Sequence, residues 1–409
     1  MVNIGLLGLG TVGTGIVQII EDRKNYLQKL IGTEINISKI LIRDMNKKRR
    51  IGIHEDKLTT DFSEIVGDQD IDIIIEVMGG LEEAYVYIRE ALNRGKHVVT
   101  ANKAVVAKHL EELTFLAREK NKAFLYEASV GGGIPIIKQL KEQANLNNIQ
   151  EIKGILNGTS NFLLTKMIEE DLDFKEALKM SQKLGYAEAD PTDDIEGYDT
   201  RRKLRILTTI GFKDRVKEES ILCQGISSIK TIDIQNIKSM DCTIKLLGTA
   251  TLKDNKYYAL VEPVIIKKNS YFGKVDYATN LVSFVGNKVG ELRFYGEGAG
   301  SFPTANAILS DVIDIILKNY HKNYSLESND LDNINKLFQG RYYIRTTLEN
   351  DTKDKMIRYI NEKEITDKLI TKEKDVAFIT KKILKKEIEN IISKFNIRTE
   401  NYFIGRLEV

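Results

Sequence analysis

Apolar and polar residues alternate along the first third of the chain in a way that predicts strands and helices in turn. Short apolar runs of strand length are separated by longer stretches in which apolar residues recur every three or four positions. A regular alternation of this kind is typical of a parallel, doubly wound α/β sheet. The predicted strands are residues 2–7, 35–42, 71–76, 97–100 and 123–128, and the predicted helices are residues 14–30, 82–93 and 110–120.

The middle of the chain predicts an α+β region with an open mixed sheet. A helix at 303–319 is expected to pack back on the first domain. The resulting boundaries are 1–133, completed by helix 303–319, for the first domain and 134–302 for the second. The strands predicted in the second domain are 149–156, 243–252, 257–266, 280–286 and 289–295, and its helices include 174–184 and 199–211.

The end of the chain predicts a third, smaller domain after a linker. Residues 320–339 form a charged segment of linker composition. Residues 340–409 follow the order strand, helix, strand, strand, helix, strand, which predicts a βαββαβ domain.

Composition and charge narrow the class of protein. With 409 residues the chain is too long for one ordinary hydrophobic core, so we expect several domains. The net charge of +2 gives no reason to expect nucleic acid or an anionic membrane surface as a partner. Cys223 and Cys242 are not in a metal-type spacing, and no secretion signal precedes the first strand. We therefore expect a cytoplasmic protein with no membrane span.

A glycine-rich motif joins the first predicted strand to the first predicted helix. It reads Gly8-Leu9-Gly10-Thr11-Val12-Gly13, the dinucleotide-binding fingerprint in the strand–turn–helix context that it requires. Gly8 permits the tight turn, Gly10 lets the backbone approach a pyrophosphate, and Gly13 lets the helix pack on the strand. The N–H groups at the start of the helix would bind the phosphates.

The end of the second predicted strand bears on the choice of nicotinamide cofactor. An acidic residue there would bind the ribose 2′-hydroxyl of NAD, whereas an arginine accommodates the 2′-phosphate of NADP. Arg43 comes first, Asp44 follows, and residues 47–50 are all basic. We expect NADP, with NAD as the alternative that Asp44 leaves open and a solvated basic turn as the alternative to both. Gly79, after the strand at 71–76, is a second place where backbone could approach the cofactor.

Two further stretches contain candidate catalytic groups. Lys103 lies just past the predicted strand 97–100, at the end of the sheet where ligands bind in such folds. An acidic loop at 188–199 runs into a basic helix start, where Asp199 is expected to cap the helix and Lys203 to share its face four residues later. The alternatives are a surface lysine at residue 103 and a solvated acidic loop.

The segment 127–135 contains three consecutive glycines before Pro135. A loop of this kind exposes backbone carbonyls, which together with Glu127 could bind a hard monovalent cation through oxygen. A hinge between domains explains the same residues equally well.

These motifs together resemble the homoserine dehydrogenase family over essentially the whole chain. The resemblance implies reversible reduction of L-aspartate 4-semialdehyde to L-homoserine by NADPH or NADH, in threonine and methionine biosynthesis. It also implies a homodimer or homotetramer, with residues 134–302 as the catalytic and dimerisation domain. The segments that carry the resemblance are 8–13, 102–104, 127–135, 157–161, 185–203 and 296–304.

The resemblance also implies roles for individual residues. Glu188 and Asp199 bind the amino-acid substrate, Lys203 is the proton donor, and Lys103 lies between the nicotinamide and the substrate. A donor is needed because hydride transfer to an aldehyde leaves an alkoxide that must gain a proton. Two neighbouring ammonium groups would lower each other's pKa, which suits lysine for this role. Further residues implied by the resemblance are Gly185 and Gly298 beside the cofactor, and Glu127 with the carbonyls of Val130, Gly132 and Ile134 around Na⁺.

The C-terminal domain resembles a degenerate ACT domain, a regulatory type that senses amino acids. The loop after its first strand usually carries an acidic residue, a proline and a glycine, but residues 349–355 contain neither proline nor glycine. Because glycine lets an effector approach the backbone, its loss predicts weak or absent inhibition by threonine.

Two other functions are compatible with parts of the sequence. One is another amino-acid or semialdehyde oxidoreductase on the same scaffold; a semialdehyde dehydrogenase would need a nucleophilic cysteine, and neither cysteine lies in a motif. The other is a non-catalytic NADP sensor, which the presence of Lys103, Glu188, Asp199 and Lys203 argues against.

Overall fold

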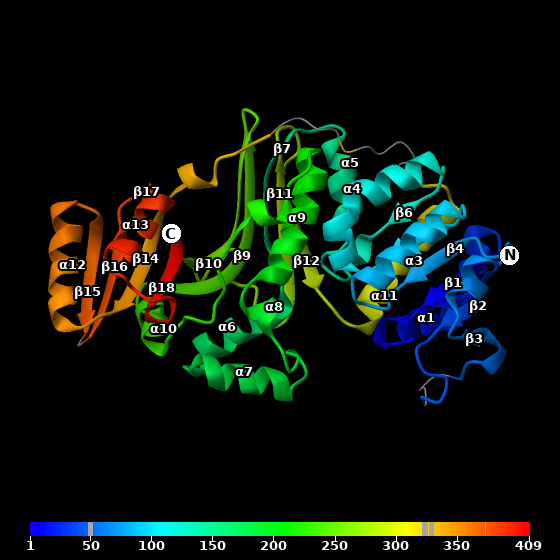
Figure 1. The fold of residues 1–409 in the computed structure, drawn as a ribbon, viewed down its shortest axis with the longest axis horizontal. Coiled ribbons are helices and arrows are strands. Elements are labelled where there is room, and N and C mark those ends of the chain that lie inside the picture. The colour runs from blue at the N-terminus through cyan, green and yellow to red at the C-terminus, as the bar shows by residue number, and fades with distance from the viewer. Residues whose placement is uncertain (48–51, 321–325, 327–330, 373) are drawn as a thin grey trace. The chain divides into compact units, whose positions relative to one another are not determined.

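The computed structural model describes residues 1–47, 52–320, 326, 331–372 and 374–409, which form two compact units (Figure 1). The first unit comprises Met1–Ile149, Arg205–Glu218 and Gly286–Asn329, and the second comprises Gln150–Leu204, Glu219–Val285 and Asp330–Val409. These divisions differ from the predicted boundaries at residues 133 and 302, so the predicted domain roles stay predictions. Lys48, Arg49 and Arg50, and residues 321–325 and 327–330 of the predicted linker, lie outside the described residues.

The first unit contains a six-stranded parallel sheet in the order β3-β2-β1-β4-β5-β6. Strand β1 pairs with β2 on one side and β4 on the other, so the chain reverses its direction across the sheet at this point. This is the switch point at which ligands bind in doubly wound folds, and the predicted α/β class is confirmed. The strands are β1 Val2–Leu7, β2 Ile35–Leu41, β3 Leu58–Thr59, β4 Ile73–Glu76, β5 His97–Thr100 and β6 Phe124–Leu125; the helices are α1 Thr11–Ile31, α2 Phe62–Val66, α3 Glu82–Asn93, α4 Lys103–Glu119, α5 Ile137–Ala144 and α11 Ser301–Ile316.

Helix α11, drawn in yellow in Figure 1, packs against α1 although nearly 300 residues separate them in sequence. The approach is close, because a Cβ on Gly15 would lie 2.7 Å from the Ser301 hydroxyl. That hydroxyl donates a 2.7 Å hydrogen bond to the Thr11 carbonyl. Ala305 and Ile308 of α11 enter the same apolar core as the strands of the sheet.

Several predicted elements of the first unit have different bounds in the structure, and the contacts of two of them explain the difference. Helix α4 begins at Lys103 rather than at residue 110, because the Asn102 side chain accepts the Val105 N–H and caps it. The strand predicted at 123–128 ends at Leu125, and Glu127–Ser129 forms a 3₁₀ turn instead. The Glu127 N–H donates to the Asp311 carboxylate, which removes it from the sheet.

The second unit contains a mixed sheet in which β9 and β10 form a long antiparallel hairpin (Figure 1). Its strands follow the order β11-β7-β9-β10-β18-β14-β16-β15. The C-terminal segment joins this sheet through the parallel pairing of β10 with β18. The strands are β7 Ile149–Ile155, β8 Leu222–Cys223, β9 Cys242–Lys253, β10 Lys256–Lys267, β11 Thr279–Gly286, β13 Asp332–Asn333, β14 Gln339–Thr347, β15 Thr366–Lys372, β16 Asp375–Thr380, β17 Ile383–Leu384 and β18 Tyr402–Glu408; the helices are α6 Gly158–Glu170, α7 Phe174–Lys183, α8 Thr192–Ile195, α10 Thr231–Lys238, α12 Asn350–Glu362 and α13 Lys385–Lys394. Helix α9 Tyr198–Phe212 belongs to the second unit as far as Leu204 and to the first from Arg205, and β12 Gly290–Glu297, which follows β11, belongs to the first.

The C-terminal segment has the predicted order of strands and helices, with the two-residue strand β17 added. Its assignment to the ACT type stays a prediction. The loop predicted at 349–355 is wrong, because α12 already begins at Asn350 and leaves only Leu348 and Glu349 between strand and helix. Lys353 and Lys355 therefore lie in the first turns of a helix. No helix among the described residues is long and apolar enough to cross a membrane.

A buried charge cluster fastens the C-terminal segment to β10. Oε1 of Glu262 accepts a 2.6 Å hydrogen bond from Nε of Arg406 on β18, and its other oxygen pairs with Lys385 of α13. Glu262 is 2% exposed. Burial alone would raise the pKa of Glu262, but the positive charges of Lys385 and Arg406 together hold that pKa below its ordinary value.

We predict that Glu262→Gln lowers the free energy of unfolding at pH 7 by about 3–5 kcal/mol, because the partly buried Lys385 loses its counter-charge and the buried Arg406 keeps only Glu408 as a carboxylate partner among the described residues. The pKa of Glu262 is depressed in the folded state, so its stabilisation is present above the unfolded pKa and is lost as pH falls through the folded pKa. The difference between variant and wild type should shrink toward zero in acid. Urea unfolding of variant and wild type, from pH 7 down to acid pH at which Glu262 is protonated, measures this difference in the free energy of unfolding.

Glu64→Gln is the matched control, since Glu64 is half exposed and pairs with Lys39 at 3.3 Å. It should change the free energy of unfolding by less than about 1 kcal/mol. A Glu262→Gln deficit that stays constant down to the acid end would contradict the ionic explanation.

Candidate active site

The first unit has an open cavity of about 1050 Å³ where β1 passes into α1. The glycine loop forms one wall, Arg43 and Asp44 after β2 form another, and Val77 and Met78 after β4 complete it. All three segments follow the carboxyl ends of parallel strands. The sequence had assigned the segment 8–13 and Arg43 to one cofactor site. The structure places Gly8, Gly10, Thr11 and Arg43 on the wall of this cavity, whereas Val12 and Gly13 do not line it.

The three glycines of the motif differ in their surroundings. Gly8 has φ +105°, and a Cβ there would lie 2.9 Å from the Val77 carbonyl. A Cβ on Gly13 would lie 2.3 Å from the Gly8 carbonyl, so only glycine lets α1 start this close to β1. Gly10 has no atom within 4 Å of its Cβ position and faces open space. The tight turn at Gly8 and the close helix packing at Gly13 agree with this geometry, and the approach of Gly10 to a pyrophosphate stays a prediction.

The start of α1 is suited to an anion. Its first turn has no acidic residue, and no side chain caps it at Gly10. The first N–H groups of a helix have no intrahelical partner and carry partial positive charge, which favours phosphate binding. The cavity therefore fits the pyrophosphate of a dinucleotide.

Arg43 is available to a ligand in this cavity. Its side chain is 78% exposed, and its guanidinium lies 3.8 Å from the Glu83 carboxylate, a weak surface pair. Gly79, the other predicted contact on this side, has φ +73° and also faces open space.

A buried carboxylate that the sequence analysis missed organises the loops around Lys103. Glu76, at the end of β4, is fully buried and accepts hydrogen bonds from the Thr100 hydroxyl (2.6 Å) and the Met78 N–H (2.8 Å). Thr100 in turn accepts the Asn102 N–H, and the Asn102 amide donates to the Gly80 carbonyl. Burial raises the pKa of Glu76, and these hydrogen bonds oppose that rise. Lys103 follows as the first residue of α4.

The second unit places the other candidate groups in one buried cluster. Nζ of Lys203 lies 2.7 Å from Oδ2 of Asp199 and donates a 2.7 Å hydrogen bond to the Leu156 carbonyl. Asp199 is 1% exposed and Lys203 is 8% exposed. The sequence predicted that these two side chains share a helix face, and this is confirmed.

Asn157 holds the carboxylates of this cluster and was not singled out by the sequence analysis. Its Nδ2 donates to Oδ1 of Asp194 (2.6 Å) and to Oδ2 of Asp199 (2.9 Å). Its Oδ1 accepts the Ser160 N–H and caps α6. One amide thus uses its donor and acceptor ends for different purposes, which fixes its orientation. The signal that could have pointed to Asn157 was its position in the segment 157–161, which is one of the segments that carry the family resemblance.

The expectation that Asp199 caps the helix is wrong. Helix α9 begins at Tyr198, so Asp199 lies inside the first turn, and its side chain points to Asn157 and Lys203. The cations at the helix start have partners both outside and within the helix. Arg202 pairs with Asp193, and the Arg201 guanidinium lies 5.0 Å from the centroid of the Tyr198 ring.

Glu188 lies on an exposed loop between α7 and α8, and its carbonyl accepts the Gln182 amide at 3.1 Å. Gly185 precedes it with φ +80° and open space at its Cβ position. Between them, Tyr186 stacks on Phe162 of α6. Gly185, Glu188, Asp199 and Lys203 all belong to the second unit, whereas Lys103 and Gly298 belong to the first. That Lys103 and Lys203 lie near each other and lower each other's pKa stays a prediction.

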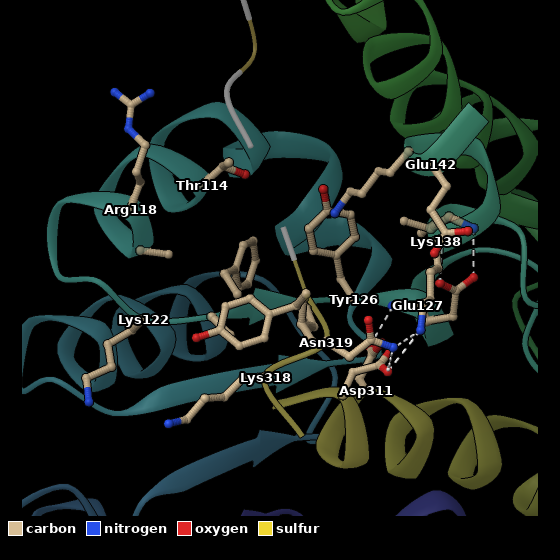
Figure 2. Close-up of a pocket in the computed structure, with 18 residues that line it drawn as sticks. Thr114, Arg118, Lys122, Tyr126, Glu127, Lys138, Glu142, Asp311, Lys318 and Asn319 are labelled. Atoms are coloured by element: carbon tan, nitrogen blue, oxygen red, sulfur yellow. Dashed lines mark hydrogen bonds and ion pairs between the residues drawn. The ribbon is translucent and has the colours of Figure 1, made fainter. Parts of the chain in front are cut away.

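Glu127 has a structural partner that the cation hypothesis did not include. Its two carboxylate oxygens accept the N–H groups of Ile137 (2.7 Å) and Lys138 (2.8 Å), so it occupies the start of α5 (Figure 2). Burial raises the pKa of Glu127 and, more strongly, that of Asp311 beside it. The Ile134 carbonyl likewise accepts the Ile136 N–H.

Both oxygens of the Glu127 carboxylate therefore accept hydrogen bonds from backbone N–H groups, which is not the arrangement that the cation hypothesis assumed. Among the described residues, no group of three or more His, Cys, Asp or Glu side chains is placed to bind a metal. Gly132 packs so tightly that its Cβ would lie 2.6 Å from the Gly298 carbonyl. Na⁺ binding through Glu127, Val130, Gly132 and Ile134 stays a prediction.

Comparison with known sequences supports the resemblance over 77% of the chain. The family model described as the NAD-binding domain of homoserine dehydrogenase matches residues 8–127, and that of homoserine dehydrogenase matches residues 135–313. The chain is 43% identical over 315 residues to a homoserine dehydrogenase of Bacillus subtilis, covering 77% of this chain and 73% of that protein. It is 44% identical over 319 residues to one from Synechocystis, with the same coverage of both chains.

Solved structures agree over the full length. A homoserine dehydrogenase from Thiobacillus denitrificans superposes with a TM-score of 0.90 at 34% identity, covering 100% of this chain and 98% of that chain. A hyperthermophilic archaeal homoserine dehydrogenase in complex with NADPH gives a TM-score of 0.67 at 26% identity, covering 80% of this chain and 99% of that chain. The first comparison includes the C-terminal segment, which the family models leave unmatched. With both family models, the relatives and the folds in agreement, the chain belongs to the homoserine dehydrogenase family.

Proposed function

We propose that the protein catalyses the reversible reduction of L-aspartate 4-semialdehyde to L-homoserine with NADPH as the preferred cofactor. Family membership supports the reaction, and the observation that carries the catalytic assignment is the buried Asn157–Asp199–Lys203 cluster. A non-catalytic sensor has no need of an ammonium held this rigidly by a carbonyl and a carboxylate.

The bound nicotinamide would supply the hydride that reaches the aldehyde carbon. The glycine loop and the N-terminus of α1 would hold its pyrophosphate, and Arg43 would contact the 2′-phosphate of NADP. An archaeal relative was solved in complex with NADPH, which supports this choice.

Lys203 would give its proton to the oxygen that becomes the homoserine hydroxyl, and would take it back in the oxidative direction. The Leu156 carbonyl and Asp199 fix the position of its Nζ, so little conformational entropy is lost at the reaction step. Glu188 and Asp199 would attract the substrate ammonium, and Lys103 would orient the substrate toward the nicotinamide.

Several wider properties follow from the same assignment. We propose a homodimer or homotetramer in the cytoplasm, serving threonine and methionine biosynthesis, with Na⁺ at the 127–134 segment. We propose weak or absent inhibition by threonine, because the connection before α12 has no glycine that would let an effector contact the backbone.

We predict that Lys203→Ala lowers kcat by about 10²–10⁴-fold, the usual contribution of a positioned acid–base group. The KM for the cofactor should stay the same, because the glycine loop is untouched. Steady-state assays of homoserine oxidation measure both. Lys179→Ala, at an exposed position of α7, is the control and should behave as wild type. Near-full kcat in Lys203→Ala would remove Lys203 from the mechanism.

We predict that Asn157→Ser lowers kcat/KM for homoserine by about 10–100-fold, the range expected for lost hydrogen bonds to charged groups. Serine still caps α6, so the helix is kept, but its side chain is too short to hold Asp194 and Asp199. The KM for the cofactor should not move. The exposed Asn145→Ser is the control. Equal losses for homoserine and cofactor would instead indicate general damage to the fold.

We predict that Arg43→Ala raises the KM for NADP⁺ by about tenfold and the KM for NAD⁺ much less, because a charge-assisted contact to phosphate is lost. Parallel titrations with both cofactors measure the ratio. Arg23→Ala is a matched control, since Arg23 lies over the exposed ring of Tyr26 on α1. If both cofactors respond equally, Arg43 is a surface residue without a role in cofactor choice.

A further inference from the structure

Two loops of the first unit follow neighbouring strands and bear on the proposed reaction in different ways. Residues 77–80 follow β4, and the first two of them line the cavity at the glycine loop. Residues 101–102 follow β5 and lead into α4, whose first residue is Lys103. The two strands pair in parallel, with Glu76 at the end of β4 opposite Thr100 at the end of β5. The cavity wall and the start of α4 therefore leave the same edge of the sheet on adjacent strands.

Hydrogen bonds, rather than packing, hold the loop at 77–80. Gly79 has φ +73° and Gly80 has φ +79°, and beyond their chain neighbours no described atom lies within 4 Å of either Cβ position. Two successive glycines in the left-handed region leave a loop with wide conformational freedom, so it needs other contacts to keep one shape. The Met78 N–H donates to the Glu76 carboxylate at 2.8 Å, and the Gly80 carbonyl accepts the Asn102 side-chain amide at 2.7 Å.

The second loop is connected to the same carboxylate through two side chains. The Thr100 hydroxyl donates a 2.6 Å hydrogen bond to Glu76 and accepts the Asn102 N–H at 2.9 Å. The Asn102 side chain in turn accepts the Val105 N–H at 3.2 Å and caps α4. The start of α4, and with it the backbone of Lys103, is therefore positioned by a chain of hydrogen bonds that begins at Glu76.

The surroundings of Glu76 are those of a charged carboxylate. Its Oε1 accepts the Met78 N–H and its Oε2 accepts the Thr100 hydroxyl, so both partners are donors. The side chain is 0% exposed; burial raises the pKa of Glu76, and its hydrogen bonds oppose that rise. Glutamine has nearly the same shape, but its NH₂ group cannot accept a hydrogen bond, and its carbonyl accepts more weakly than a carboxylate. A glutamine in this place would therefore weaken both connections.

We propose that Glu76 is a positioning residue that ties the wall of the cofactor cavity to the start of α4 and thereby sets the position of Lys103. It acts through Met78 on one side and through Thr100 and Asn102 on the other. The inference rests on the proposed function, because it takes Lys103 to orient the substrate. Misplacing such a group by about 1 Å can cost about 10²-fold in rate, so the two connections affect kcat.

Two variants of the full-length protein separate the two connections. Thr100→Val breaks only the connection to α4, so kcat for homoserine oxidation should fall about tenfold, while the Kd for NADPH, measured by fluorescence titration, stays at the wild-type value. Glu76→Gln weakens both connections, so kcat should fall by about 10–100-fold. Amide hydrogen exchange should become faster at 77–80 and 101–105 in Glu76→Gln, and only at 101–105 in Thr100→Val.

A conservative variant and a control separate positioning from general stability. Thr100→Ser keeps the hydroxyl and should recover most of the kcat that Thr100→Val loses. Glu262→Gln removes a buried carboxylate from the second unit, so it should lower stability and leave kcat unchanged.

The proposal is overturned if Thr100→Ser and Thr100→Val lose kcat equally, a comparison that holds even if Glu76→Gln does not fold. It is also overturned if hydrogen exchange becomes faster in Glu76→Gln while kcat stays near wild type. Absence of homoserine oxidation in the wild type would instead refute the proposed function. Unchanged hydrogen exchange at both loops of Glu76→Gln would refute the two connections whatever reaction the protein catalyses.

Discussion

The buried ion pair of Asp199 and Lys203 sets the arrangement of the candidate catalytic cluster. A lysine ammonium that is almost removed from water needs a counter-charge and hydrogen-bond acceptors. Asp199 supplies the charge and the Leu156 carbonyl at the end of β7 supplies an acceptor. Both requirements tie the start of α9 to the segment between β7 and α6, so the sheet, two helices and the candidate proton donor are fixed by the same few contacts.

Asn157 shows why a neutral residue is needed beside these charges. Asp194 and Asp199 lie close enough to share one amide, and without a donor between them the two carboxylates would repel each other. The amide satisfies one oxygen of each without adding a charge. A positively charged residue in its place would compete with Lys203 for Asp199.

Buried carboxylates connect distant segments in other parts of the molecule. Glu76 connects the ends of β4 and β5 beside Lys103, and Glu127 occupies the start of α5. In the second unit Glu262 joins β10 to α13 and β18. The cost of burying each carboxylate is offset by N–H, hydroxyl or cationic partners from segments distant in sequence. The loops that form the candidate sites are thereby held by groups that do not themselves react.

The sequence alone determined the main strands and helices of both units, the glycine loop and the family, because hydrophobic period and short motifs are local properties. Strands β1 and β5 and helix α3 have the predicted bounds, whereas short elements such as β3 and α8 were not predicted. Only the tertiary structure decided which groups meet. The Leu156 carbonyl and Lys203 are 47 residues apart, and Glu127 and Asp311 are 184 apart. No periodicity encodes such pairings, since they depend on how the chain returns to the same place and on which buried groups then need partners. The capping role of Glu127 and the correction for Asp199 therefore came from the fold.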